Sequence, residues 1–266
     1  HTVNLPYSAS DRARWPIPCI KNTMTQSMID FSDVTLITVA AGTGTRFGAD
    51  MPKQYLDIHT PSGDMPVIIA TLRRMAHLLP GAQLLVVVSE TWQAHMAALL
   101  DRHGLSGRVA IVCGGATRTE SVSNALAAVR EGCRYIGVHD GVRPIITPEV
   151  VSDAIAAVRE GAEGAIPAIE VTDSLRLIEA DGESSPVDRS LYRAVQTPQF
   201  FPAPLLIGAY ASRDTHATYT DDASVLAAAG HTDIRLTPGS PCNIKITHPL
   251  DIEIAEIYLR QSVQTK

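Results

Sequence analysis

The chain has 266 residues, of which 45% are hydrophobic and only 5% aromatic, and it carries a formal net charge of −6. A chain this long and this apolar can bury a sizeable core, which excludes a disordered protein, a collagen-like protein and a small disulfide-held module. The acidic balance gives no reason to expect nucleic-acid or membrane partners, because non-specific binding to either needs a basic face.

The hydrophobic runs, the cysteine spacing and the first 32 residues give expectations about location and domain organisation. No run of about 18 apolar residues is present, so we expect a soluble protein without a membrane-spanning helix. The four cysteines show no C-x-x-C spacing, which argues against a zinc or redox motif and favours reduced thiols in a cytoplasmic protein. Residues 1–32 contain no motif that carries chemistry and are interpreted as a variable extension or an expression remnant. Residues 33–266 are expected to form a single domain.

From Val34 onward, short β-branched runs alternate with helix-length amphipathic runs, which is typical of βαβ units around a mostly parallel sheet. The pattern predicts strands at residues 34–42, 84–89, 109–113 and 135–139. It predicts helices at residues 66–79, 90–103, 117–131 and 148–160, and a surface loop at residues 59–66. Thr117 and Glu120 form a T-x-x-E capping box, and Gly132 is expected to end the helix that they begin.

The alternation changes after a further strand at residues 164–171. Two extended pieces, 174–178 and 190–195, flank a turn rich in Gly, Ser and Pro, which predicts a β-hairpin arm over about residues 169–195. A helix at 220–229, a short strand at 243–247 and a closing helix over Pro249 to Gln261 follow. The fold class is therefore α/β, a Rossmann-like, mostly parallel sheet flanked by helices, with a protruding arm.

The first candidate site is the loop A40-A-G-T-G-T-R-F-G48, directly after the first strand. Glycines at a turn from strand to helix let backbone N–H groups approach a phosphate closely. The loop is neither a Walker A motif nor G-x-G-x-x-G, because Phe47 stands where the third glycine should be. A tight turn is the alternative, but Arg46 and Lys53 supply the fixed positive charge that a triphosphate needs.

Asp140 marks a second candidate site, because it ends the fourth strand, where ligands bind in open α/β sheets. A carboxylate beside a phosphate site makes sense mainly with Mg²⁺ between them, although an Asp in a turn can also cap the next segment. The neighbouring His139 is interpreted as a packed strand residue rather than a base.

Two further segments could contribute to the same site. Gly114 and Gly115 follow the third strand and could cradle a ligand, or they could simply begin the capped helix. Lys245 alternates with two isoleucines and is expected to face away from the apolar side at the end of the sheet.

Eight motifs follow one another along the chain: A40-A-G-T-G-T-R-F-G, P52-K-Q-Y-L, G114-G-x-x-R-x-x-S-V, H139-D-x-x-R-P, D188-R, Q196-T-P-Q-F-F, T220-D-D-A-S and N243-I-K-I-T. In this combination they closely resemble the 2-C-methyl-D-erythritol 4-phosphate cytidylyltransferase family, from about Leu36 to Leu259. The resemblance implies a homodimeric nucleotidyltransferase fold. It also implies Mg²⁺-dependent transfer of CMP from CTP to methylerythritol 4-phosphate, with release of pyrophosphate, in the non-mevalonate route to isoprenoids.

The resemblance also implies roles for single residues. Arg46 and Lys53 would stabilise charge on the triphosphate in the transition state, and Arg189 and Lys245 would hold the methylerythritol phosphate for attack. The nucleotide would be bound by Ala40, Ala41, Gly42, Gly44, Gly115 and Ser121. The phosphosugar side would be formed by Asp140, Arg143, Ser174, Thr197 and Thr220, with Asp140 beside Mg²⁺. The arm would bring Ser174 and Arg189 to the pocket of a second subunit.

Three alternatives remain at this point. A ribitol-5-phosphate cytidylyltransferase would share the cytidine side, and the segments D140-G-V-R-P and D173-S-L-R depart from the usual D-A-A-R-P and D-T-x-K. The motifs Q196-T-P-Q-F-F and T220-D-D-A-S favour methylerythritol. A nicotinamide-dependent oxidoreductase is disfavoured by the missing third glycine and by the absence of an acidic residue for the ribose. A non-catalytic nucleotide-binding module is disfavoured because both Arg46 and Lys53 are present.

Overall fold

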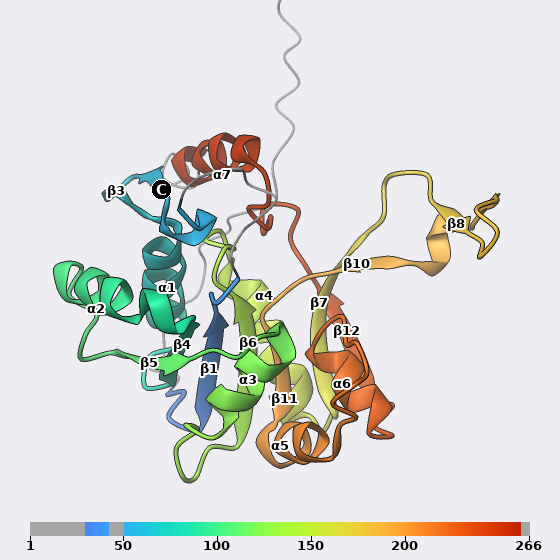
Figure 1. Ribbon diagram of the computed structural model, residues 1–266, viewed down its shortest axis with the longest axis horizontal. Coiled ribbons are helices and arrows are strands. Elements are labelled where there is room, and N and C mark those ends of the chain that lie inside the picture. The colour runs from blue at the N-terminus through green and yellow to red at the C-terminus, as the bar shows by residue number, and fades with distance from the viewer. Residues whose placement is uncertain (1–29, 43–50, 262–266) are drawn as a thin grey trace, which may run out of the picture.

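The computed structural model describes residues 30–42 and 51–261, and most of its strands form one sheet flanked by helices (Figure 1). The sheet has eight strands: seven follow the order β10-β7-β11-β6-β1-β4-β5, and the eighth, β12, pairs with β7 outside this order. In chain order they are β1 (Val34–Val39), β4 (Gln83–Val88), β5 (Val109–Cys113), β6 (Tyr135–Asp140), β7 (Gly164–Glu170), β10 (Arg193–Val195), β11 (Gln199–Pro202) and β12 (Ile234–Pro238). The run β6-β1-β4-β5 is parallel, and β10 and β11 are antiparallel to their neighbours. The predicted Rossmann-like class is confirmed.

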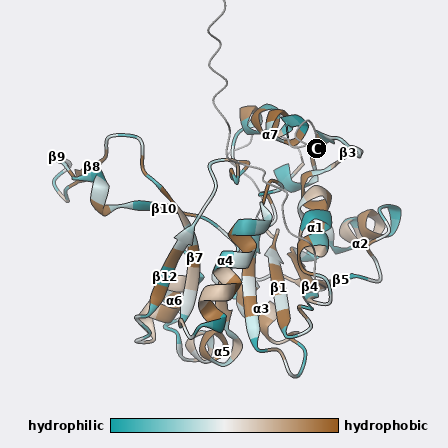
Figure 2. Ribbon diagram, turned by 180° about the vertical axis from the view of Figure 1, so that it is seen from behind, coloured by the Kyte–Doolittle hydropathy of each residue, from teal (hydrophilic) through white to brown (hydrophobic). Residues whose placement is uncertain are grey.

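Helices cover both faces of this sheet, because alternate residues of each strand point to opposite sides. Leu84 and Val86 of β4 pack with one apolar cluster, whereas Leu85 and Val87 pack with the other. The first cluster includes residues of α1 (Val67–Leu78), α2 (Gln93–Arg102), α4 (Pro148–Arg159) and α7 (Pro249–Gln261). The second includes residues of α3 (Arg118–Leu126), α5 (Ala203–Ser212) and α6 (Asp222–Ala228). Figure 2 shows hydrophilic and hydrophobic residues together on α1, α2 and α4, as expected of helices with one buried face.

The helices α1, α2, α4, α6 and α7 lie where the sequence predicts them, but α3 ends at Leu126, well before Gly132. The side chain of Gln83 accounts for the early end. Its amide donates to the Ala128 carbonyl (2.9 Å) and accepts from the Arg130 N–H (2.9 Å), two groups that a longer helix would pair internally. The predicted capping box is half present, because Thr117 accepts from the Glu120 N–H (3.0 Å), whereas the Glu120 carboxylate accepts from the preceding Ala116 N–H.

The arm is present and extends away from the body of the molecule (Figure 1), but its strands pair differently from the prediction. The first extended piece forms β8 (Arg176–Ile178), which pairs with β9 (Ser184–Pro186) in a small sheet of its own. The second piece contains a 3₁₀ turn, η4 (Arg189–Leu191), and then β10, which joins the main sheet beside β7. The nearer partner prevails because a short loop costs less chain entropy to close than a long one.

Three further segments differ from the prediction. Residues 243–247 are not a strand; the main chain there bonds to Ser240 and Val142 instead. The strand in that region is β12. The strand β11 lies on a segment that the sequence analysis interpreted only as a motif, and α5 was not predicted. The expected surface loop at 59–66 is a hairpin of β2 (Asp57–Thr60) and β3 (Gly63–Pro66).

Single residues complete the comparison with the prediction. Cys113 and Cys133 are free thiols as expected, but Cys242 is disulfide-bonded, so the prediction of reduced thiols is wrong for it. Spacing could not reveal this bond, because disulfide partners need only approach in space.

Phe31, which was assigned to the extension, is buried in the first apolar cluster. Among the described residues, no helix is long and apolar enough to cross a membrane.

Candidate active site

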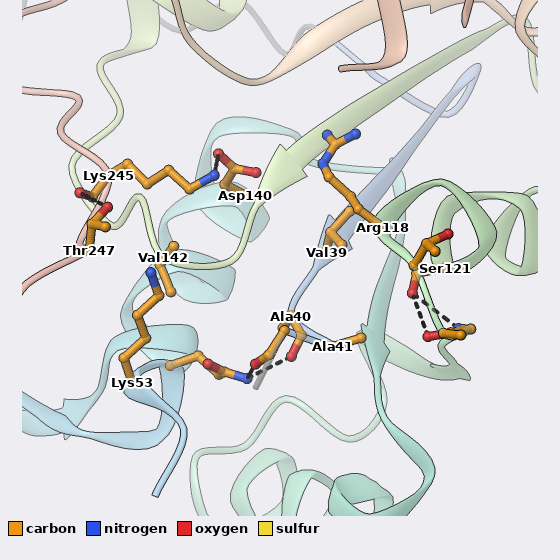
Figure 3. Close-up of a pocket in the computed structure, with 15 residues that line it drawn as sticks. Val39, Ala40, Ala41, Lys53, Arg118, Ser121, Asp140, Val142, Lys245 and Thr247 are labelled. Carbon is orange, nitrogen blue, oxygen red and sulfur yellow. Dashed lines mark hydrogen bonds and ion pairs between the residues drawn. The ribbon is translucent and has the colours of Figure 1, made fainter. Parts of the chain in front are cut away.

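A cavity of about 350 Å³ lies at the carboxyl ends of β1, β5 and β6. In the sheet, β4 and β5 lie on one side of β1 and β6 lies on the other, so the cavity stands where the strand order reverses. Ligands of open α/β sheets bind at this position, and the volume is within the range of small-molecule sites. Figure 3 shows Lys53, Lys245 and Asp140 on one side of the cavity and Ser121 on the other.

The floor of the cavity is the main chain from Ala40 to Gly42, which follows β1 directly. Gln54, in the 3₁₀ turn η2 (Lys53–Tyr55), is almost completely buried and donates from Nε2 to the carbonyls of Ala40 (2.8 Å) and Gly42 (2.9 Å). The same turn places Lys53 on the wall of the cavity. Sequence analysis identified Lys53 but missed Gln54, although both stand in the P52-K-Q-Y motif.

The loop after β5 approaches the floor closely, and its two glycines make this possible. A Cβ at Gly114 would lie 2.8 Å from the Ala41 Cβ, and a Cβ at Gly115 would clash with Glu120. The Gly115 N–H donates to the buried Ser121 hydroxyl (3.1 Å), which fixes the loop against α3. Gly115 and Ser121 both line the cavity, so the prediction that this loop forms part of a site is supported by its position.

Arg118, the first residue of α3, also lines the cavity and was not singled out from the sequence. Its guanidinium donates to Asp222 Oδ2 (2.6 Å), and the Tyr210 hydroxyl donates to the other oxygen of this fully buried carboxylate (2.6 Å). Burial lowers the pKa of Arg118, but Asp222, with smaller contributions from Asp140 and Tyr210, raises it by more, so the group stays charged. The signal was the Arg of G114-G-x-x-R, whose partner lies in the T220-D-D-A-S motif.

Asp140 ends β6 and presents a charged carboxylate to the cavity. Its Oδ2 atom forms ion pairs with Lys245 Nζ (3.1 Å) and Arg143 Nε (3.1 Å). Burial alone would raise the pKa of Asp140, but Lys245, Arg143 and Arg118 together hold it well below its usual value. The carboxylate is therefore ionised across the physiological range.

Several residues expected on the phosphosugar side do not line this cavity. Arg143 is buried behind Asp140, and its guanidinium also donates to the Asn243 carbonyl (2.7 Å). Thr197 is buried with its hydroxyl directed at the Asp140 N–H (3.0 Å), and Thr220 is exposed just before α6.

The arm residues lie farther away. Ser174 and Arg189 are exposed on the arm, outside the lining of their own chain's cavity, and Arg189 donates to the Thr172 carbonyl. Two further site residues expected from the sequence, Gly44 and Arg46, lie outside the described residues.

The charges of the cavity suit a polyanion. Among the described residues, Lys53, Arg118 and Lys245 line it together with one carboxylate, Asp140, in a chain whose net charge is −6. In the described lining, no Ser or Thr hydroxyl is paired with a histidine or carboxylate that could activate it as a nucleophile. The chemistry that this arrangement favours is stabilisation of negative charge on a bound phosphate chain.

Known proteins with similar sequences and structures agree with the fold described above and indicate a reaction. Residues 34–261 match the family model described as 2-C-methyl-D-erythritol 4-phosphate cytidylyltransferase. The enzymes of that name from Bacteroides fragilis and Phocaeicola vulgatus are 39% and 38% identical, over 85% and 84% of this chain and 99% and 98% of theirs. The crystal structure of the enzyme of that name from Thermus thermophilus superposes with a TM-score of 0.68 at 28% identity, over 85% of this chain and 98% of that one.

Proposed function

The chain belongs to the 2-C-methyl-D-erythritol 4-phosphate cytidylyltransferase family, and from that membership we propose which side of its cavity binds each substrate and which residues take part in the reaction. The enzyme is a nucleotidyltransferase that transfers CMP from CTP to 2-C-methyl-D-erythritol 4-phosphate and releases pyrophosphate. The relatives do not favour the ribitol 5-phosphate alternative, because they carry the methylerythritol name.

The cytidine is assigned to the side of the cavity formed by Ala40 to Gly42, Gly115 and Ser121. These residues offer backbone groups and a single hydroxyl, so the base is read mainly by main-chain hydrogen bonds in a narrow space. Gln54 supports this assignment, because it fixes two carbonyls of the floor and thereby defines which acceptors face the ligand. Gly44, by its place in the loop motif, is assigned to the same nucleotide.

The triphosphate is assigned to the cationic side, near Lys53. The substrate phosphate oxygen attacks the α-phosphorus of CTP; a new P–O bond forms there, the bond to the β-phosphate oxygen breaks, and pyrophosphate leaves. Negative charge grows on the departing phosphates, and Lys53, with Arg46 from the loop motif, stabilises it. Binding both reactants in line supplies the rest of the rate enhancement, since no covalent enzyme intermediate is needed.

The methylerythritol phosphate is assigned to the part of the cavity beside Lys245 and Asp140, with Arg143 behind them. Lys245 is the described cation nearest to this carboxylate on the cavity wall, and its chain position matches the N243-I-K-I-T motif. It holds the attacking phosphate and reduces its repulsion from the triphosphate.

Asp140 also fits a magnesium site. Within the described part of the chain, both of its ion pairs fall on Oδ2, and no cluster of three or more His, Cys, Asp or Glu side chains occurs there. One carboxylate is sufficient, because Mg²⁺ keeps several waters and takes its other ligands from substrate phosphates. Bound there, the ion would neutralise charge on the triphosphate.

A homodimer completes the proposal. Five apolar side chains of the arm are between 45% and 81% exposed: Leu177, Ile178, Leu191, Tyr192 and Val195. A two-stranded hairpin in water is marginally stable, so these side chains need a surface to cover them. A second copy of the chain provides that surface, and each arm then brings Ser174 and Arg189 to its neighbour's phosphosugar pocket. We also propose a cytoplasmic location.

The observation that carries this proposal is the cation-lined cavity at the ends of β1, β5 and β6, in a chain matched to the family over residues 34–261. It is tested by measuring pyrophosphate release from each of the four nucleoside triphosphates with methylerythritol 4-phosphate and with ribitol 5-phosphate. We expect release with CTP and methylerythritol 4-phosphate, with UTP as the strongest competitor. Equal rates with ATP, or with ribitol 5-phosphate, would contradict the assignment.

A further inference from the structure

Val142 is an apolar side chain on the part of the cavity wall that is assigned to the polyol phosphate. It stands two residues after Asp140 and lines the cavity together with Asp140 and Lys245. In the view of Figure 3, it lies between Lys245 and Lys53. Val39, the other valine of the described lining, ends β1 and packs with the second apolar cluster, whereas Val142 belongs to the first. A polyol held by Lys245 and Asp140 therefore meets Val142.

Hydrogen bonds on both sides hold the main chain at Val142 in place. Its carbonyl accepts from the N–H of Ile246 (3.0 Å), the residue that follows Lys245. The preceding residue, Gly141, donates to the Val39 carbonyl (2.9 Å), and a Cβ at Gly141 would lie only 3.0 Å from the same oxygen. The segment is thus packed against the floor of the cavity on one side and tied to the lysine segment on the other. Val142 keeps a fixed distance from both.

The polyol of the proposed reaction carries one apolar branch. In 2-C-methyl-D-erythritol 4-phosphate every carbon of the four-carbon chain holds an oxygen, and the methyl group on C2 is the only branch without a polar atom. A methyl group gains free energy where an apolar contact removes it from water. The ion pair of Asp140 and Lys245 (3.1 Å) offers no such contact, whereas the neighbouring valine does.

We propose that Val142 contacts the C2 methyl group of the bound polyol and is a specificity-determining residue, which makes the enzyme prefer a methyl-branched polyol phosphate to an unbranched one. The inference rests on the function proposed above and extends it, because contacts to the phosphate and the hydroxyls alone would accept erythritol 4-phosphate equally well. The size of the preference is bounded, since one methyl group in an apolar site changes specificity by roughly 10- to 200-fold.

The ratio of two kcat/KM values measures this preference. With CTP in excess, methylerythritol 4-phosphate and erythritol 4-phosphate are compared in the wild type, in Val142→Ala and in Val142→Thr, which keeps the shape of the side chain but replaces one methyl group by a hydroxyl. We expect the wild type to prefer the branched substrate by at least about tenfold. Both variants should lower the ratio by roughly 3- to 10-fold, through slower reaction of the branched substrate alone.

A third variant and the ratio itself serve as controls. Val142→Ile adds a methylene group to the wall and should slow the branched substrate more than the unbranched one, because only the branched substrate needs that space. A purely structural role for Val142 would lower both kcat/KM values equally, and an unchanged ratio in Val142→Ala and Val142→Thr would overturn the inference.

A measurement on the wild type keeps the inference testable if a variant fails to fold. With methyl-labelled valine and the bound reaction product, NOE spectra should show a cross-peak between the C2 methyl group and the Val142 methyl protons. Its absence, with product binding shown by shifts of other cavity signals, would overturn the inference.

The outcomes separate the two proposals. No pyrophosphate release from CTP with either polyol phosphate refutes the proposed function, and this inference with it. Release with equal kcat/KM for both polyol phosphates in the wild type refutes only the role of Val142.

Discussion

Gln54 holds the floor of the cavity, where we propose that the nucleotide binds, through one side-chain nitrogen that donates to two carbonyls. Gln54→Leu removes the donor and leaves both carbonyls without it, which should cost about 1–2 kcal/mol and raise the KM for CTP about tenfold. Gln54→Glu should be worse, because a carboxylate would face two carbonyl oxygens. Steady-state kinetics with each substrate varied in turn checks this, and an unchanged KM for CTP in both variants would show that the floor holds its shape without Gln54.

Lys53 carries a different expectation, because its charge is assigned to the transition state rather than to the floor. Lys53→Ala should lower kcat by roughly 10²- to 10³-fold, the scale for removing one fixed donor to developing charge. Arg46→Ala should behave in the same way. Single-turnover measurement of CMP transfer checks the chemical step, and a near-normal rate in either variant would contradict the role given to that residue.

Asp222 gives a prediction about stability. Its carboxylate is fully buried between Arg118 and Tyr210, so Asp222→Ala leaves a cation and a hydroxyl without their partner. The free energy of unfolding should fall by roughly 3 kcal/mol, as when one member of a buried pair is removed. Asp233→Ala, which removes an exposed partner of Arg235, is the control and should change stability by less than about 1 kcal/mol. Urea denaturation measures the free energy of unfolding of both variants. Equal decreases would show that the buried ion pair stabilises the protein no more than the exposed one.

At the scale of residues, the motifs identified the chemistry but not the direction of each side chain. Asp140 could be predicted because it ends a strand at the edge where ligands bind, Lys53 because it follows a candidate phosphate loop, and Lys245 because it stands in the N243-I-K-I-T motif. Arg143 and Thr197 come from equally specific motifs, yet both lie behind the wall, since their hydrogen bonds are made to Asp140. A motif records that a residue matters to a site, whereas contact with the ligand depends on packing.

Among the elements, the β2–β3 hairpin offers a test by pH. His59 Nδ1 lies 2.5 Å from Asp64 Oδ1 across the hairpin, and this hydrogen bond raises the pKa of His59 above its usual value. A raised pKa means that the contribution to stability is complete below the unfolded pKa, about 6.5, and is lost as pH rises through the folded value. A proton NMR titration should show the raised pKa in the wild type and a lower one in Asp64→Asn, and identical values would rule out this hydrogen bond in solution.

The strands also show which elements a sequence pattern can predict and which it cannot. Central strands such as β4 could be predicted, because both of their faces are buried and their apolar runs are continuous. The strand β12 could not, because it lies beside β7 with most of its side chains exposed or half-buried, and so lacks such a run. The segment 243–247 alternates like a strand, but its main chain bonds to neighbouring loops rather than to a sheet edge.

For the whole molecule, the proposed sharing of sites between subunits can be tested by mixing. Inactive Arg189→Ala protein is combined with inactive Lys53→Ala protein under conditions that allow subunits to exchange. If Arg189 acts on the neighbouring pocket, half of the dimers are mixed and each has one intact site of two. About a quarter of wild-type activity should then return. An absence of recovery, with exchange demonstrated independently, would mean that the arm serves its own subunit.

The layered architecture could be predicted as a whole, since alternation of strands and amphipathic helices allows few arrangements. The partner of the arm could not, because pairing beyond a short turn depends on which strands lie close in space. The sequence placed the second arm segment beside the first, whereas β10 joins the main sheet and continues through Gln196 and Thr197 into β11.

The exposed apolar side chains of the arm have a consequence for how much catalyst a cell obtains from a given amount of protein. In the proposed dimer, a pocket is complete only when two copies meet, so at low concentration the number of working sites rises with the square of the monomer concentration. Specific activity would then fall on dilution. Flux through the reaction would respond more steeply than linearly to expression until dimerisation is saturated.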